Sequence, residues 1–173
     1  KNPSQFLLLM NYEDFSLEEI KKYIPIVYLR ELLNQELIKK FKFSKYDSKN
    51  INSLRKWSNE LKKKSIEEFS EIERFNLHKD LEAILPSFIF YLPYNCHKKW
   101  LARWRNKNDK LFHPRNFISG KDLKNLVGID DGPLLGELIN YISREFAFGR
   151  VNNFDDAIYK ARYWFQQNAP KYD

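Results

Sequence analysis

The chain has 173 residues, of which 43% are apolar and 16% aromatic, enough to fold around one sizeable core or two small ones. Basic residues outnumber acidic ones by 30 to 23, which gives a formal net charge of +7, and the single cysteine is Cys96. This composition excludes a disordered tail and an internal disulfide, and it suits a reducing cytoplasm. The best candidate for a membrane span, 83–92, is about half the length needed to cross a bilayer and contains Pro86, so we expect no membrane partner.

The start of the chain is Lys1, where a complete protein would have methionine. The sequence then enters an apolar run, 6–10, almost at once and without a targeting signal. We therefore expect the chain to be a piece of a longer protein.

The N-terminal part of the sequence predicts two helices. Ser16 and Glu19 form a capping-box pattern that opens one helix, and Pro25 should stop it, because proline lacks the amide proton that a helix interior needs. Apolar residues then recur at helical spacing over 26–40, which predicts an amphipathic helix. A loop rich in lysine, serine and asparagine follows.

The next segment predicts two more helices and contains one ambiguous run. Residues 51–61 have amphipathic spacing, and Ser65 with Glu68 forms a capping box for the helix that follows. The run 81–92 fits either a buried helix broken at Pro86 or a strand. We favour the helix, because no second strand is available to pair with it.

The remaining sequence predicts a helix at 95–105, a polar loop at 106–117, a helical hairpin at 119–146 and a last amphipathic helix. The sequence therefore predicts an all-α fold with no sizeable sheet. We expect a helical, RNA-binding body region, 1–115, and a helical tail, 116–173, that carries the hairpin.

The hairpin holds most of the glycine of the chain. All five glycines come after residue 119: Gly120, Gly128, Gly132, Gly136 and Gly149. Ser119 with Asp122 caps the first helix, and Gly128 ends it. Pro133 suits the first position of the second helix.

Two interpretations of this hairpin are open. Glycine lets another backbone approach, and the N-terminus of a helix has unpaired N–H groups that can hold a phosphate, as in helix-hairpin-helix modules that grip nucleic-acid backbones. Alternatively, it is a tight structural hairpin whose glycines only allow close packing. Asp130 and Asp131 beside the turn count against phosphate binding.

The positive charge is concentrated in two blocks. Residues 21–64 hold thirteen basic and four acidic residues, and residues 98–115 hold seven basic residues and one acidic residue. The segment between them, 65–97, has two basic and six acidic residues. The uneven distribution of charge, more than the net charge of the chain, therefore indicates that anionic partners bind at these two blocks.

The second block also interleaves aromatic residues with the cations. On a helix, Trp100 and Trp104 lie one turn apart, as do Lys99 and Arg103. Clustered cations beside aromatic faces are typical of nucleic-acid sites, through charge neutralisation and stacking. We expect both tryptophans to belong to the core, as large aromatic side chains usually do, and the cations to be functional.

No pattern in the sequence predicts a catalytic or metal-binding residue. His78, His97 and His113 are far apart and lack metal-ligand spacing. Cys96 and His97 are adjacent, so on a helix their side chains point in different directions. We interpret these residues as structural, and the glutamates between positions 67 and 73 as a solvated helix face.

Four features occur together in the last third of the chain. These are a Ser-Gly-x-Asp-Leu step at 119–123, the glycines and Gly-Pro of 128–136, a turn at Gly149 and Asp-Ala at 156–157. This arrangement resembles the C-terminal region of bacterial tRNA nucleotidyltransferases of the poly(A) polymerase-like class. The runs between residues 74 and 114 also look like the helical middle of bacterial members.

The resemblance implies a parent enzyme that adds CMP or AMP to the 3′ end of tRNA, or poly(A) to RNA, through an N-terminal catalytic head domain that uses Mg²⁺. No glycine precedes Gly120, so the glycine segment of such a head is not in this chain. The chain would be a non-catalytic body and tail with no cofactor of its own. Its partners would be tRNA or another RNA, and its own head domain.

The expected RNA-binding residues come from two sources. The resemblance places backbone contacts at Gly132, Pro133 and Gly136, with Lys121 and Lys124 as nearby cations. The second basic block adds Lys98, Lys99, Arg103, Arg105, Lys107 and Arg115. Two other functions stay open: a helix-hairpin-helix module for DNA, and a helical scaffold for protein interactions whose basic faces only aid solubility.

Overall fold

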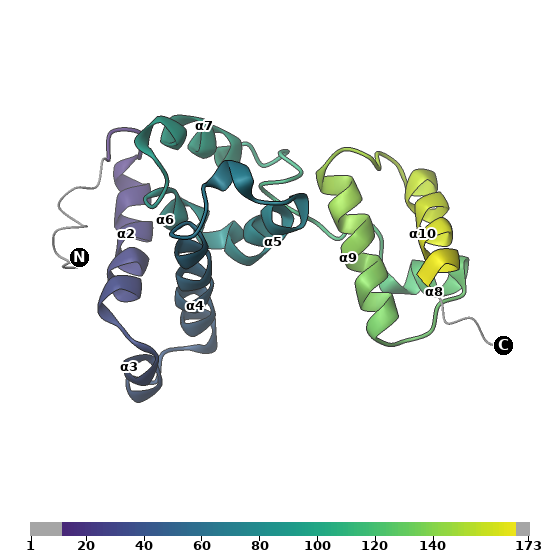
Figure 1. The fold of residues 1–173 in the computed structure, drawn as a ribbon, viewed down its shortest axis with the longest axis horizontal. Helices are drawn as coiled ribbons and strands as arrows, with labels where there is room; N and C mark the ends of the chain where they lie inside the picture. Colours follow the sequence, from purple (N-terminus) through teal and green to yellow (C-terminus); the bar gives the residue numbers. More distant parts are fainter. Residues whose placement is uncertain (1–11, 169–173) are drawn as a thin grey trace. The chain divides into compact units, whose positions relative to one another are not determined.

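A computed structural model describes residues 12–168, and this part of the chain is helical with no strand, which confirms the all-α prediction (Figure 1). The longer helices are α2 (Leu17–Leu32), α4 (Lys45–Glu60), α5 (Glu71–Leu81), α7 (Tyr94–Arg105), α8 (Gly120–Val127), α9 (Pro133–Ala147) and α10 (Phe154–Asn168). The shorter elements are α3 (Gln35–Lys40), α6 (Leu85–Ile89) and the 3-10 turns η1 (Ile66–Glu68) and η2 (Glu82–Ile84). In the described range, no helix is both long enough and apolar enough to cross a membrane.

The chain divides into two compact units, residues 1–112 and residues 113–173. Each unit has its own hydrophobic core, the first enclosed by α2 to α7 and the second by α8 to α10. In the loop after α7, Phe112 still belongs to the first core and Ile118 already belongs to the second. The chain therefore passes from one core to the other inside this loop.

Helix α2 runs through Pro25, so the prediction that Pro25 stops it is wrong. Ser16 does cap the helix with Glu19 in a capping box, as predicted. Proline in a helix interior removes a backbone hydrogen bond and typically costs about 3 kcal/mol. Here Tyr23 and Val27 are buried in a helix that packs against α4 and α6, while Pro25 is exposed, so tertiary packing outweighs the local cost.

The helix predicted over 26–40 is interrupted at Asn34. The side-chain oxygen of Asn34 accepts a hydrogen bond from the Leu37 amide at 2.8 Å and caps a new helix, α3. Helix α4 likewise begins inside the segment predicted as a loop, because Ser44 accepts from the Asp47 amide at 3.0 Å. Short polar side chains therefore set these boundaries, whereas apolar spacing alone misplaces them.

Two capping boxes follow one another before α5, so the single helix predicted from Ser65 is split. Ser65 with Glu68 closes the turn η1, and Ser70 with Glu73 then opens α5. The two carboxylates accept from the cap amides at 2.6 and 2.8 Å. The capping role of Glu68 was predicted and is confirmed, whereas Glu73, interpreted as part of a solvated face, also acts as a cap.

Helix α6 lies at the centre of the first unit. All of its residues are buried, and it contacts α2, α4, α5 and α7. Pro86 lies in its first turn, where the missing amide proton costs little, so the run 81–92 is helical as we favoured. Proline begins this helix, whereas the sequence analysis expected a break there.

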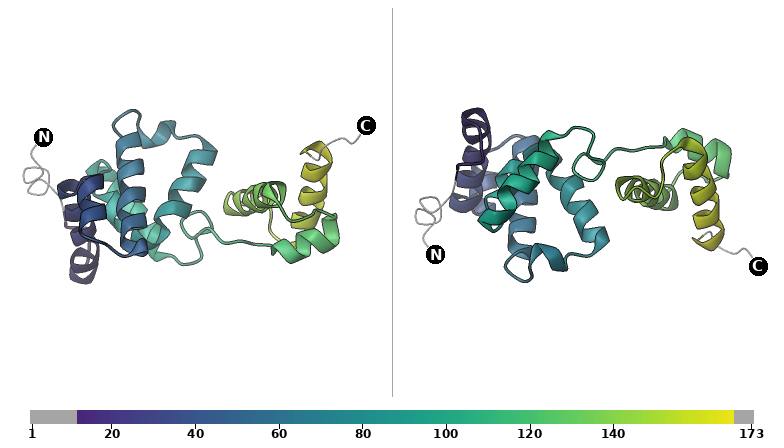
Figure 2. Two further views of the ribbon diagram at one scale, coloured as in Figure 1. Left: turned by 90° about the horizontal axis from the view of Figure 1, so that it is seen from below. Right: turned by 90° about the horizontal axis from the view of Figure 1, so that it is seen from above.

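The second unit consists of α8, α9 and α10, which Figure 2 shows from two further sides. Ser119 and Asp122 form the predicted capping box, and Gly128 ends α8 in the left-handed conformation with φ of 79°. Pro133 is the first residue of α9. The fully buried Leu138 marks the apolar face of α9, and each of the three helices contacts the other two.

Candidate nucleic-acid interface

Helix α7 carries the second basic block, and its tryptophans pack against the core of the first unit. Trp104 donates its indole N–H to the carbonyl oxygen of Glu82 at 3.0 Å and meets Tyr23 edge-on, 5.6 Å between ring centroids. Trp100 packs against Phe112 with centroids 5.2 Å apart. Both indoles are half-buried, so the stripe of tryptophans borders the core, as we expected, and is not a free aromatic surface.

Two lysines in the middle of α7 are available to an outside partner. Lys98 and Lys99 are both exposed, and neither has an ion-pair partner within residues 12–168. An unpaired lysine keeps its full charge for an incoming phosphate, whereas a paired lysine must first lose its carboxylate.

Arg103 is held in a fixed orientation by Asp109. Its Nε and Nη2 donate to the two carboxylate oxygens at 2.7 and 3.2 Å, and its guanidinium lies 4.3 Å from the centroid of the Phe112 ring. Burial acts to raise the pKa of Asp109, but hydrogen bonds from Arg103 and from backbone amides outweigh burial and lower it. Asp109 is therefore ionised at neutral pH and orients the guanidinium.

Arg105 is engaged with the protein itself. It donates to both carboxylate oxygens of Glu19, at 2.9 and 2.5 Å, and to the carbonyl oxygen of Asp14 at 2.9 Å. The hydrogen bond from Arg105 is the main reason why the pKa of Glu19 lies below its usual value, although partial burial opposes it. This pair joins the end of α7 to the start of α2.

Three cations of the basic block lie beyond α7, and two of them, Lys107 and Arg115, are among the expected RNA-binding residues. Lys107 places its ammonium group 4.5 Å from the centroid of the Trp104 ring. Arg115 is exposed and belongs to the second unit. The structure therefore brings Lys99 and Arg103 together on α7 and separates Arg105 from them by its contact with α2.

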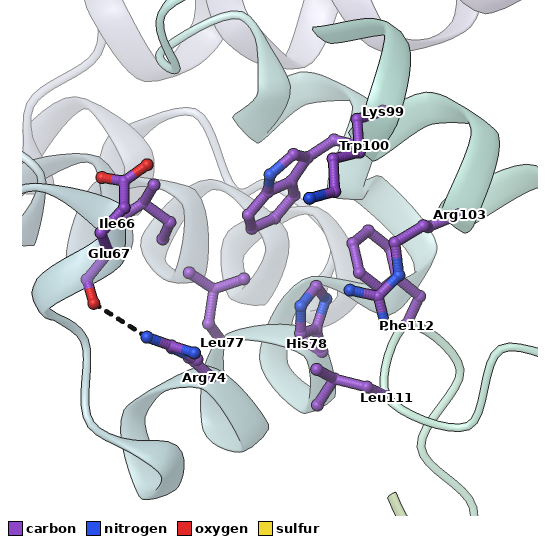
Figure 3. Close-up of a pocket in the computed structure, with 10 residues that line it drawn as sticks. All are labelled: Ile66, Glu67, Arg74, Leu77, His78, Lys99, Trp100, Arg103, Leu111 and Phe112. Carbon is purple, nitrogen blue, oxygen red and sulfur yellow. Dashed lines mark hydrogen bonds between the residues drawn. The ribbon is translucent and has the colours of Figure 1, made fainter. Parts of the chain in front are cut away.

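A pocket of about 250 Å³ lies beside these cations, between η1, α5, α7 and the loop after α7 (Figure 3). Figure 3 shows Trp100 and Lys99 on one side of this pocket and Arg74 on the other, with Arg103 at one end. Among the described residues, Glu67 is the one carboxylate that lines it. The pocket thus combines an aromatic ring with a surplus of positive charge.

A further group of lysines belongs to the first basic block, for which the sequence analysis named no site residue. Lys62, Lys63 and Lys64 line an open hollow next to η1, and Ile66 and Glu67 border both this hollow and the pocket. Lys63 and Lys64 form ion pairs with Glu60 and Glu73 at 2.7 and 2.6 Å. Lys62 is exposed. Three consecutive lysines were the signal that could have identified this group.

The hairpin of the second unit presents backbone at the start of α9. This helix begins without a side-chain cap and without an acidic residue in its first turn, so side chains leave its first N–H groups open. Gly132 precedes it with φ of 157°, a conformation that side chains rarely adopt. A Cβ atom at Gly132 or at the exposed Gly136 would meet no described atom within 4 Å. Close packing therefore explains neither glycine, although Gly120 does lie near Ile139.

The charges around the hairpin are partly neutralised. Lys124 pairs with Asp131 at 2.7 Å, while Lys121 is exposed. Pro133 is also exposed, at the first position of α9. Asp131 thus compensates a lysine, so one of the two aspartates that count against phosphate binding is itself neutralised.

The histidines and the cysteine occupy structural positions. His78, His97 and His113 are all buried, and the ring of His97 makes a hydrogen bond of 3.1 Å with the carbonyl oxygen of Leu92. Burial raises the pKa of Cys96, which is the opposite of what a reactive thiolate needs. Among residues 12–168, no three His, Cys, Asp or Glu side chains form a group that could hold a metal ion.

The sequence of the chain matches the family model described as "tRNA nucleotidyltransferase domain 2 putative" over residues 24–161, which is well over half of its length. The chain belongs to this tRNA nucleotidyltransferase family. Every candidate residue named above from α7 to α9 lies inside the matched range. The CC-adding tRNA nucleotidyltransferase of Synechocystis sp. is 33% identical over 86 residues, which cover 46% of this chain and 21% of that protein. No solved structure matches the chain.

Membership of the nucleotidyltransferase family confirms the resemblance seen in the hairpin. The match also begins at Ile24, well before residue 74, where the resemblance seen in the sequence begins. Most of α2 and all of α4, with the lysine-rich first block, therefore belong to the same family region as the hairpin.

Proposed function

We propose that this chain is the RNA-binding body and tail of a tRNA nucleotidyltransferase, and that it holds tRNA while a catalytic head domain transfers nucleotides. The observation that supports this proposal best is the surface of α7, where Lys98 and Lys99 are exposed and have no ion-pair partner among the described residues, beside the oriented Arg103. Cations that no carboxylate neutralises gain most from phosphates, because binding releases the counterions condensed on the nucleic acid.

In this proposal the chain recognises the shape and backbone of tRNA rather than its sequence. Double-stranded RNA offers phosphates and 2′-hydroxyl groups across a wide, shallow minor groove, while the bases in its deep, narrow major groove are out of reach. The cations of α7 would neutralise phosphates of the tRNA backbone. The uncapped start of α9, with Gly132, Pro133 and Gly136, would donate amides to a further phosphate, and Lys121 would add charge.

The transfer chemistry belongs, in this proposal, to the head domain and its Mg²⁺. The similarity to a CC-adding enzyme favours the addition of CMP to tRNA as the reaction that the chain serves, over poly(A) synthesis. We therefore expect no nucleotide incorporation by the chain alone.

Fluorescence anisotropy with labelled tRNA, duplex DNA and single-stranded RNA at several salt concentrations tests the proposal. We expect tRNA to bind most tightly and the logarithm of its affinity to fall linearly with the logarithm of the salt concentration. Equal or tighter binding of duplex DNA would instead favour a helix-hairpin-helix module for DNA. A weak, salt-independent response to all three ligands would favour the protein-interaction scaffold.

A further inference from the structure

The pocket between α5 and α7 has one aromatic wall that a ligand can reach. His78 and Phe112 are 2% and 1% exposed, whereas Trp100 is half-buried and lines the pocket with part of its indole. The indole stacks on His78 with centroids 5.3 Å apart and meets Phe112 edge-on. These neighbours fix the plane of Trp100, so a flat ligand can stack on it without first ordering the side chain.

The cations around this wall are also arranged before any ligand binds. Asp109 and the Phe112 ring hold Arg103, and Arg74 donates to the carbonyl oxygens of Phe69 and Glu67 at 2.9 and 2.8 Å. Lys99 lies one helical turn from Arg103 on α7 and is unpaired within the described residues. An anion bound between Lys99 and Arg103 would lie next to the exposed part of Trp100.

The size and charge of the pocket limit what it can hold. Its volume, about 250 Å³, is below the roughly 300–1,000 Å³ of pockets that enclose drug-sized molecules. Arg74, Lys99 and Arg103 outnumber Glu67 and the Asp109 that pairs with Arg103, so the described surroundings of the pocket favour an anion. The indole favours a flat aromatic group. A nucleobase with one attached phosphate meets all three conditions, whereas an apolar peptide side chain would give the charge of Lys99 no partner.

We propose that this pocket binds one unstacked nucleobase together with its phosphate, the base on Trp100 and the phosphate between Lys99 and Arg103. This proposal rests on the proposed function, because it adds an unpaired nucleotide of the RNA to the duplex backbone that the first unit would bind. Single-stranded RNA is held in this way in general, by aromatic stacking beside a cationic track. A free nucleotide has the same chemistry and is the second possible source.

The direct test changes the ligand and leaves the protein intact. Wild-type chain is titrated with a fluorescein-labelled adenosine pentamer and with a pentamer of the same phosphates whose riboses carry no base. Stacking of one base makes the adenosine pentamer bind roughly five- to a hundredfold more tightly. Competition by ATP, with tripolyphosphate as the control without a base, shows whether a free nucleotide also enters.

Two protein variants locate the effect. Lys99→Ala weakens binding of the adenosine pentamer more than Lys98→Ala does, because both lysines are exposed and unpaired but only Lys99 lines the pocket. Trp100→Leu removes the preference for the pentamer with bases, and circular dichroism checks that this variant is folded. If Trp100→Leu does not fold, the affinities of the two pentamers for wild type and for the lysine variants still test the proposal.

The failure of this proposal differs from the failure of the proposed function. Equal affinity of the two pentamers, or equal effects of the two lysine variants, overturns the nucleobase pocket even if tRNA binds with the expected salt dependence. Discrimination between the pentamers without any affinity for tRNA retains the pocket and contradicts the tRNA-holding function. Displacement by ATP but not by tripolyphosphate supports the pocket and shows that free nucleotides can fill it.

Discussion

The two units of the chain differ in the groups that they expose for the proposed contact with RNA. On α7 of the first unit, Lys98 and Lys99 have no ion-pair partner in the part of the chain that the structure describes, and Arg103 is oriented beside a pocket. In the second unit, Lys124 is neutralised by Asp131, and the exposed feature is the uncapped, glycine-bearing start of α9. We infer that the first unit supplies most of the electrostatic attraction and the second unit supplies backbone amides that position the RNA.

Cations of one basic block also differ in whether they are engaged inside the protein. Arg105 and Lys99 lie on the same helix, yet Arg105 is bound to Glu19 and Asp14 whereas Lys99 faces the pocket unpaired. Arg105 is engaged because the start of α2 packs beside it. Contacts made inside the protein therefore decide which charges remain for a partner.

The largest expected effect comes from charge reversal on α7. Lys98→Glu combined with Lys99→Glu should weaken tRNA binding on the order of tenfold, because two phosphate contacts become repulsive. Lys45→Glu with Lys49→Glu, two exposed lysines on α4, changes the net charge equally and serves as the control. Anisotropy titrations at one salt concentration compare the pairs, and an equal loss for both would mean that only net charge matters.

Arg105→Ala should affect stability and leave tRNA binding nearly unchanged. The pair with Glu19 is partly exposed, so its loss should cost about 1 kcal/mol or less of unfolding free energy. Urea denaturation measures this loss, and Glu19→Gln should produce a similar one because it weakens the same pair. A fall in tRNA affinity as large as that of the α7 lysine pair would show that Arg105 binds RNA after all.

Gly136→Ala should separate stability from binding in the hairpin. Alanine in a helix is favoured over glycine by roughly 0.5–1 kcal/mol, and its Cβ at position 136 meets no described atom, so the fold should become more stable. If a phosphate approaches the backbone there, tRNA affinity should fall several-fold. Gly132→Ala is the contrasting variant, because its φ of 157° strains alanine and should lower the melting temperature. Stabilisation by Gly136→Ala with unchanged affinity would remove the hairpin from the interface.

The smallest effect concerns the acid stability of the first unit. Hydrogen bonds from Lys64 and from the Ser70 amide lower the pKa of Glu73 from 4.5 to about 2. Because the folded chain holds this carboxylate ionised to a lower pH than the unfolded chain, its contribution is complete above pH 4.5 and is lost as the pH falls toward 2. Glu73→Gln can still accept from the cap amide without the charge, so stability should depend less on pH in this window. Urea denaturation between pH 7 and 2 measures the free energy of unfolding of wild type and variant. The same pH profile in both would contradict the assignment of the lowered pKa to Glu73.

Sequence patterns predicted those parts of the fold that depend on neighbours within one turn. The capping boxes at Ser16 and Ser119 and the left-handed Gly128 are of this kind, because each is completed within three or four residues. The same local rules failed at Pro25, where burial of Tyr23 and Val27 keeps α2 continuous.

The candidate site was less predictable, because its partners are distant in sequence. Arg105 and Glu19 are 86 residues apart, and the pocket needs η1, α5 and α7 to meet. The sequence therefore identified the basic block as a whole, but it could not separate the engaged Arg105 from the available Lys99. It also named no residue among the lysines at the end of α4, since their position beside η1 arises only on folding.

The measurement that tests the division between the two units most directly is the salt dependence of tRNA binding in two variants. With Lys98→Glu and Lys99→Glu, the slope of log affinity against log salt should become flatter by about 1.4 to 1.8, the loss expected for two phosphate contacts. With Gly136→Ala, the slope should stay the same while affinity falls at every salt concentration. Equal slopes in wild type and the lysine variant, or a flatter slope in the glycine variant alone, would contradict the account that the first unit supplies the charge and the second the backbone contact.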